Sequence, residues 1–359
     1  MKKEVLLAHW PKITNKRYQQ LLDFFSSLDN AWSAEKKDFI EMGWKDEIIQ
    51  NFFDWKNNLN IEKIAKILDQ EKITCILKTN KNYPNRLKEI YDAPFCLFVR
   101  GNLENIDYPL AVVGPRKFSP YGRQVCEEIV SGLSRHGISI ISGLALGIDS
   151  IAHQSCLNAG GKTIAVLGSG INKTHIYPAQ HRDLSEKIIE SGGAIISEYP
   201  AGALPSKFTF PRRNRIVAGM TIGTLVIEAG TGSGALITAQ SALDNNREVF
   251  AVPQNITSKN STGVNNILKT GAHLVTSAQD IIDVLDLNDI KQYIDNKKIV
   301  PESPTEEKLL EFLSREPTHI DNLVKKTKLD SPSVNATLSL MEMKGMVKNL
   351  GGMMYVINK

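Results

Sequence analysis

From residue 108 onward, short unbroken apolar runs alternate with amphipathic segments of helical length. The runs cover 110–113, 138–141, 163–167, 194–197, 224–227 and 248–252, and the helical segments lie near 120–135, 148–159, 180–191, 212–219 and 234–245. Strands that are apolar on both faces and joined by helices form parallel sheets with helices on both sides. The pattern therefore predicts an α/β fold with a doubly wound parallel sheet, completed by a helix near 264–271 and a strand at 272–276.

Chain length and composition are those of a globular protein with more than one domain. The 359 residues are 42% hydrophobic and 23% charged, and the net charge is +4. A mildly basic chain permits an anionic partner without requiring one. The four cysteines form no Cys-x-x-Cys pair, and no apolar run reaches the length of a membrane span. We expect free thiols, a cytoplasmic location, and no contact with a membrane.

Regions outside the α/β pattern suggest two smaller domains. Apolar residues recur at helical spacing through residues 1–72, which predicts a small helical, SAM-like module whose tryptophans are core residues. Residues 73–108 are expected to form a connector with short strands at 74–77 and 95–99. Together with the α/β region that follows, this connector makes up a domain spanning 73–285. Residues 286–304 are polar and contain two prolines, which is typical of a linker.

The last segment, 305–359, has the layout of a winged helix. Helices are expected at 305–313, 320–326 and 333–343, followed by a hairpin of 346–350 and 353–357 that turns at Gly351-Gly352. The third helix carries Asn335, Ser339 and Glu342 but no arginine. Duplex DNA binding and a protein contact therefore both remain open for this domain.

Small residues follow the predicted strands, where doubly wound folds bind their ligands. The segments are 114–116, 142–144, 168–170, 198–200 and 228–234, and helices are expected to begin near Ser119, Gly147 and Ser233. Glycines expose N–H groups, and helix N-termini favour anions. Ordinary turns also use glycine and serine, but several together predict an anion-binding rim.

The most basic segment is 207–215, Lys-Phe-Thr-Phe-Pro-Arg-Arg-Asn-Arg, with no carboxylate between Glu198 and Glu228. Arginine and lysine suit phosphates, and phenyl rings suit unpaired bases. Alone, the segment could be a basic surface loop ahead of a helix. Arg215 could also be structural, paired with Glu228.

Several common motifs are excluded. Residues 160–163 lack the first glycine of a phosphate-binding P-loop, and residues 168–173 lack the third glycine of a dinucleotide fingerprint. The histidines form no helical pair at metal spacing with a carboxylate, so neither a metal nor another cofactor is expected. Ser142 and Ser233 have no evident His and acid partner for a catalytic triad.

Together these segments resemble the DNA-processing protein A family (DprA or Smf). The similar segments are 113–116 with Ser119 and 121–122, 142–149 with 152–153, 163–170 with 177–178, 210–216, 228–229 with 233–239, and 250–253. The resemblance covers about 75–275 and follows the family's motif order. The chain departs from the family at Pro115 and Gln254, where small residues or glycine are usual, and Pro115 removes one N–H donor.

The resemblance implies an extended Rossmann domain that binds single-stranded DNA, self-associates, and loads RecA recombinase during natural transformation. It implies a homodimer without enzymatic activity, and DNA contacts at Arg116, Lys207 and Phe210. Adding the strand ends and the basic segment, we predict DNA contacts from Arg116, Ser142, Gly143, Gly168, Lys207, Phe210, Arg212, Arg213, Asn214, Arg215, Ser233 and Gly234.

Two alternatives belong to other functional classes. A nucleotide phosphoribohydrolase of the lysine-decarboxylase-like group would bind a nucleotide phosphate at a Pro-Gly-Gly-x-Gly-Thr-x-x-Glu loop. The corresponding segment, 229–238, lacks both the Pro-Gly-Gly start and the glutamate. A transcription regulator would instead bind duplex DNA through the winged helix.

Overall fold

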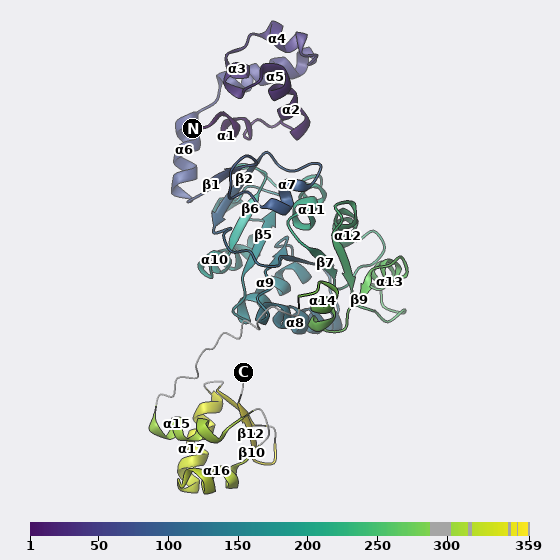
Figure 1. Cartoon of the computed structure of the whole chain (residues 1–359). Helices are drawn as coiled ribbons and strands as arrows, with labels where there is room; N and C mark the ends of the chain where they lie inside the picture. Colours follow the sequence, from purple (N-terminus) through teal and green to yellow (C-terminus); the bar gives the residue numbers. More distant parts are fainter. Residues whose placement is uncertain (288–302, 315–317, 344–345, 350, 358–359) are drawn as a thin grey trace. The chain divides into compact units, whose positions relative to one another are not determined.

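The computed structural model describes residues 1–287, 303–314, 318–343, 346–349 and 351–357. The chain divides into two compact units, Met1–Tyr293 and Ile294–Lys359 (Figure 1). Most of the predicted linker, 286–304, lies outside the described residues.

A nine-stranded sheet forms the centre of the first unit, in the order β1-β2-β6-β5-β4-β3-β7-β8-β9. The strands are β1 (Thr74–Leu77), β2 (Cys96–Gly101), β3 (Leu110–Val113), β4 (Ile140–Ser142), β5 (Thr163–Leu167), β6 (Ala194–Ser197), β7 (Gly223–Val226), β8 (Glu248–Ala251) and β9 (His273–Leu274). From β3 the chain builds outward through β4 and β5 to β6. It then returns to place β7 on the other side of β3, so the strand order reverses at β3.

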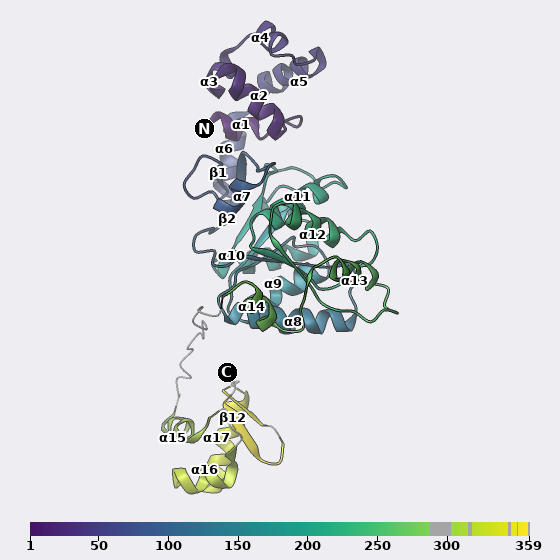
Figure 2. The same ribbon diagram turned by 45° about the vertical axis from the view of Figure 1, so that its right-hand side comes forward.

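Helices cover both faces of this sheet, as the alternation predicts (Figure 2). Side chains of β3 show why its run is unbroken: Ala111 and Val113 pack into the core on one face, and Leu110 and Val112 into the core on the other. The first face carries α7 (Asn85–Glu89), α11 (Thr209–Gly219), α12 (Gly234–Asp244) and α13 (Thr262–Lys269). The opposite face carries α8 (Pro120–Arg135), α9 (Ile148–Asn158) and α14 (Ala278–Val284). The predicted doubly wound α/β fold is confirmed.

The segment expected to be a connector also extends the sheet. Strands β1 and β2 pair with each other in antiparallel orientation, and β2 pairs antiparallel with β6. The helix α10 (Arg182–Glu190) packs beside them, with Ile188 in the same core cluster as Phe98. Residues 198–203, which follow β6, therefore lie near residues 94–96 at the start of β2.

An N-terminal helical module packs against this edge. It contains α1 (Lys3–Leu7), α2 (Asn15–Phe25), α3 (Leu28–Ser33), α4 (Lys36–Glu41), α5 (Asp46–Asn57) and α6 (Ile61–Gln70). Trp10, Phe39, Trp44 and Phe52 are buried in its core, which is rich in ring contacts. Tyr18 stacks on Phe95 just before β2, with ring centroids 4.2 Å apart, which fixes the module against the sheet.

The second unit contains α15 (Pro304–Phe312), α16 (Ile320–Thr327) and α17 (Ser331–Met343), with a sheet in the order β10-β12-β11. Strands β11 (Val347–Asn349) and β12 (Met354–Ile357) form the expected hairpin, and Gly351 and Gly352 have the positive φ values its turn requires. The short strand β10 (Thr318–His319), which the sequence analysis missed, pairs with β12. The predicted winged helix is confirmed.

Candidate nucleic-acid interface

A cavity of about 310 Å³ opens at the point where the strand order reverses, and we call it the switch-point cavity. Residues following β3, β4 and β7 line it together with one side of α11 and the start of α12. It therefore lies where open α/β sheets bind their ligands. The lining residues are Val113, Gly114, Pro115, Arg116, Gly143, Ala145, Asp149, Phe210, Arg213, Asn214, Val217, Ser233, Gly234, Ala235 and Thr238.

Helix α11 explains how the basic segment is divided. It begins at Thr209, three residues earlier than the sequence analysis placed it, so most of the segment is helical. Phe210, Arg213 and Asn214 recur at helical spacing and line the switch-point cavity. Arg212 and Arg215 lie on the other side of the helix, where both are ion-paired with Glu198.

Arg215 is a structural residue, but its partner differs from the one considered in the sequence analysis. Its Nη2 lies 2.5 Å from Glu198 Oε2, and its Nε lies 3.1 Å from Asp92 Oδ2. The side chains of Arg215 and Glu198 are 14% and 8% exposed. The pairing of Arg215 with Glu228 is therefore wrong. Buried in this way, Arg215 is unavailable to a phosphate.

Glu228 instead holds the start of α8 in place. Its carboxylate accepts hydrogen bonds from the backbone N–H and the hydroxyl of Ser119, which caps that helix, and from Asn260 Nδ2 at 3.2 Å. Gly122 packs directly on the carboxylate, so a larger residue would not fit there. This arrangement anchors the turn that carries Arg116.

Arg213 is also buried, but it forms the floor of the cavity. Its guanidinium donates to the carbonyl of Val166 and lies against Gly143, where any Cβ would collide with it. Burial lowers the pKa of Arg213, and the nearby Asp149 carboxylate opposes that shift. Burial likewise raises the pKa of Asp149, against the effect of Arg213. The two side chains place opposite charges beneath the turn after β4.

Asp149 orders that turn. Its Oδ2 accepts hydrogen bonds from the backbone N–H of Gly143 at 3.1 Å and of Ala145 at 3.4 Å. The next turn residue, Gly147, has φ +89° and lies directly under the carbonyls of Pro115 and Arg116. A side chain at this position would displace the turn after β3. The turns after β3 and β4 are thus packed together as one support for Arg116.

The exposed side chain of Arg116 lies beside the half-buried ring of Phe210. The Arg116 guanidinium carbon lies 5.5 Å from the centroid of the Phe210 ring. The Tyr177 and Phe210 ring centroids are 5.6 Å apart, and the two ring planes are tilted by 41°. Tyr177 is 43% exposed. An aromatic pair beside an exposed guanidinium can stack on a base and contact its phosphate.

Ser233 and Gly234 bring a helix N-terminus to the same cavity. The Ser233 side chain caps α12, accepting from the N–H of Ala235 at 3.3 Å, and Asn214 Nδ2 donates to the Gly234 carbonyl at 3.2 Å. The end of this helix carries a partial positive charge. Both residues line the switch-point cavity, and their contact with DNA stays a prediction.

Four other predicted contacts lie elsewhere. Ser142 is completely buried, and its hydroxyl donates to the Val112 carbonyl at 2.6 Å, so we remove it from the expected DNA contacts. Gly168 is buried beneath Phe210 and supports that ring. Lys207 is exposed outside the cavity lining, with its ammonium 5.2 Å from the Phe208 ring centroid. Arg212 faces a different cavity.

Sequence reasoning missed Tyr177 and Asp149 as site residues. Tyr177 lies in the segment 177–178 that resembles the family, which was the available signal, but only the fold brings its ring to Phe210. Asp149 follows Gly147 and Ile148 at the start of α9, and a carboxylate in the first turn of a helix was the available signal. The two departures from the family are accommodated. The backbone N–H and carbonyl of Gln254 both bond to the side-chain amide of Asn265, and the Gln254 side chain donates to the Ile227 carbonyl at 3.0 Å. The Pro115 carbonyl accepts from Ile148 N–H.

Among the described residues, the structure has no group of three or more His, Cys, Asp or Glu side chains that could hold a metal ion. No helix in the described part of the chain is both long and apolar enough to cross a membrane.

Comparison with known proteins decides the family. Residues 74–286 match the family model described as DNA recombination-mediator protein A. This chain belongs to that family. Residues 296–353 match a second model, the DprA winged helix domain. The resemblance inferred from the ordered motifs is confirmed, and it places the chain among DNA-processing proteins.

One relative in this DNA-processing family covers nearly the whole chain, and another covers about half of it. Protein Smf of Synechocystis is 32% identical over 94% of this chain and 94% of its own length. The DNA processing protein DprA of Streptococcus pneumoniae is 45% identical over 56% of this chain and 70% of its own length.

Solved DprA structures share the fold. The crystal structure from Streptococcus pneumoniae superposes with a TM-score of 0.68 at 35% identity, covering 79% of this chain and 98% of that one. The protein from Helicobacter pylori, described with a single-stranded DNA binding mode, has a TM-score of 0.55 at 28% identity, covering 61% and 98%.

Proposed function

We propose that this protein binds single-stranded DNA with little sequence preference and loads RecA recombinase onto DNA that enters the cell during natural transformation. It would act in the cytoplasm, as a homodimer and without enzymatic activity. The observation that carries the DNA-binding part is the exposed Arg116 guanidinium over the Phe210 ring, at the cavity where the strand order reverses. The similarity to the Helicobacter pylori protein supports the same ligand.

The contacts fall into two kinds. Arg116 and Lys207 are exposed cations and would contact phosphates, while Phe210 would stack on a base. The N-terminus of α12, at Ser233 and Gly234, would receive a further phosphate. Arg213 and Asn214 form the cavity floor and would contribute positive potential and a polar side chain. Because stacking suits every base, little sequence preference follows.

The test is an anisotropy titration of the full chain with a labelled single-stranded oligonucleotide and its duplex, at several salt concentrations. We expect the single strand to bind more tightly. Each phosphate contact contributes roughly −0.7 to the log–log salt slope of single-strand binding. Arg116→Ala with Lys207→Ala should therefore make the slope shallower by about 1.4. The exposed Lys269 at the end of α13 lies outside the cavity lining, and Lys269→Ala is the matched control.

Two results would contradict the proposal. Equal affinity for single strand and duplex would contradict single-stranded DNA as the preferred ligand. An unchanged salt slope in the double variant would contradict phosphate contacts from Arg116 and Lys207. Release of a free base from AMP by the purified protein would instead favour the phosphoribohydrolase, although residues 229–238 lack that family's glutamate.

A further inference from the structure

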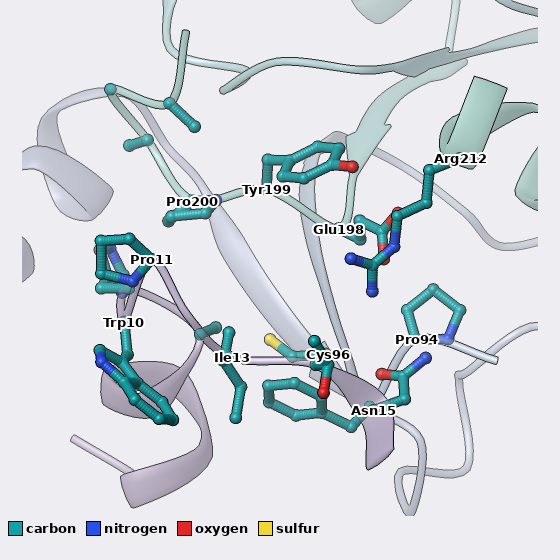
Figure 3. Close-up of a pocket in the computed structure, with 17 residues that line it drawn as sticks. Trp10, Pro11, Ile13, Asn15, Pro94, Cys96, Glu198, Tyr199, Pro200 and Arg212 are labelled. Carbon is teal, nitrogen blue, oxygen red and sulfur yellow. The ribbon is translucent and has the colours of Figure 1, made fainter. Parts of the chain in front are cut away.

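Arg212 of α11 faces a second cavity, of about 440 Å³, which lies between the N-terminal helical module and the sheet (Figure 3). We call it the N-terminal cavity. The Arg212 guanidinium lies next to the Glu198 carboxylate, which is also bonded to Arg215. Because these charges compensate one another, this side of α11 attracts the phosphates of a bound strand only weakly.

A shallow hollow adjoins the switch-point cavity on its other side, and we call it the Tyr177 hollow. Leu146 contributes to it from the turn after β4, and Tyr177 and Pro178 contribute from the loop after β5. Its volume of about 20 Å³ has room for little more than a water molecule, so a base could only lie across its rim. The remaining lining is shared with the switch-point cavity and consists of Arg116, Gly143, Ala145, Phe210 and Arg213.

The rim of the Tyr177 hollow exposes two large apolar side chains. Leu146 is 42% exposed and Tyr177 is 43% exposed. Single exposed apolar residues are common on protein surfaces. These two come from different loops, line one hollow and border the proposed DNA site, and adjacent exposed apolar side chains of this kind mark binding surfaces.

Hydrogen bonds and ring packing hold this rim in place. His181 Nδ1 donates to the Leu144 carbonyl at 2.8 Å, which ties the turn after β4 to the segment that follows Tyr177. The Tyr177 ring rests against Phe210 at a centroid distance of 5.6 Å. Binding to a surface that is already ordered loses little conformational freedom.

Arg116 lies where the two binding surfaces meet. Its side chain lines both the switch-point cavity and the Tyr177 hollow. Neighbouring nucleotides of a strand are joined by a single phosphate. A guanidinium placed between two adjacent base sites can therefore contact the phosphate that links the two nucleotides.

We propose that the Tyr177 hollow is a second base site for the single strand. The nucleotide next to the one on Phe210 stacks its base on Tyr177 and contacts Leu146, while Arg116 contacts the phosphate between them. This inference rests on the proposed function, and it makes a dinucleotide the smallest ligand that uses the whole site. Because stacking suits every base, no base preference follows.

The test is displacement of labelled dT12 from the full chain by short unlabelled ligands. The ligands are 5′-phosphorylated dT2 and its two analogues in which one nucleotide is abasic, so that the phosphates are kept and one base is lost. We expect dT2 to bind roughly tenfold or more tightly than either analogue, as expected for one additional stacked base. Equal affinity of the three ligands would overturn the proposal.

Variants of Tyr177 locate the second base. Tyr177→Ala should weaken dT2 binding roughly tenfold and leave the abasic analogues within about twofold, because their single base uses Phe210. Tyr177→Phe should bind dT2 like the unmodified chain, since stacking uses the ring. Tyr91→Ala is the matched control, because Tyr91 is fully exposed and lines neither the switch-point cavity nor the Tyr177 hollow. Unchanged dT2 binding in Tyr177→Ala would contradict the second site.

A different role for Tyr177, support of the Phe210 ring alone, gives other results. It would weaken dT2 and the abasic analogues equally in Tyr177→Ala. In titrations with dT12, a second base site makes the losses of Tyr177→Ala and Phe210→Ala multiply in the double variant. A double variant that binds no more weakly than Phe210→Ala would contradict the proposal.

Failure of the proposed function is distinguishable from failure of this inference. If the chain does not bind single-stranded DNA, labelled dT12 gives no signal to displace. If only the second base site is wrong, dT12 still binds and depends on Phe210, but Tyr177→Ala binds it like the Tyr91→Ala control.

Discussion

At the scale of single residues, neighbouring arginines have different roles. Arg116 is exposed over Phe210, whereas Arg215 is enclosed between Glu198 and Asp92. Removing one partner of a buried ion pair leaves the other charge without compensation. We expect Arg215→Ala to lower the free energy of unfolding by about 3 kcal/mol or more in denaturant titrations. Arg116→Ala should leave stability unchanged and weaken DNA binding, and the opposite pattern would contradict these assignments.

Phe210 belongs to the binding surface rather than to the core. Its ring is half-buried between Tyr177, Gly168 and Arg116. Base stacking on an aromatic ring is worth about 1–3 kcal/mol, so Phe210→Ala should weaken single-strand binding roughly tenfold or more. Phe208→Ala is the control, because Phe208 is 74% exposed and outside both cavities. An unchanged affinity for single-stranded DNA in the Phe210→Ala variant would contradict the stacking contact.

At the scale of helices and strands, local patterns predicted most of the fold. Unbroken apolar runs located the parallel strands to within a residue or two, because a strand covered on both faces needs apolar side chains throughout. The antiparallel addition of β1 and β2 was missed, since nothing within 73–108 shows which sheet edge the strands will join.

The same scale explains what was missed in the site. Phe210, Arg213, Asn214 and Val217 have the spacing of one helix face, and Pro211 suits a first turn. Starting α11 at Thr209 would have separated these residues from Arg212 and Arg215. The choice of Glu198 over Glu228 as the partner of Arg215 depends instead on tertiary packing, which no local pattern contains.

At the scale of the whole molecule, the winged helix has its own core, which includes Leu309, Leu323, Leu338 and Tyr355. Within the described residues, the exposed positions of α17 carry no basic side chain; they are Ser331, Pro332, Asn335, Ala336, Ser339, Leu340 and Glu342. This composition favours a protein contact over duplex binding.

We therefore expect a chain ending at residue 287 to bind single-stranded DNA within about twofold of the full chain, because both cavities belong to the first unit. Anisotropy titrations of the two chains test this. A large loss of affinity would show that the winged helix takes part in DNA binding.

The attachment of the N-terminal module to the sheet has a practical consequence for protein production. Tyr18 stacks on Phe95, and Val5 and Ala8 share a core cluster with Phe98. A shortened protein beginning near Thr74 would expose the side chains of Phe95 and Phe98 to water. Exposed apolar patches promote aggregation. Recombinant versions intended for crystallisation or binding assays should therefore keep the N-terminus intact and be shortened only beyond α14.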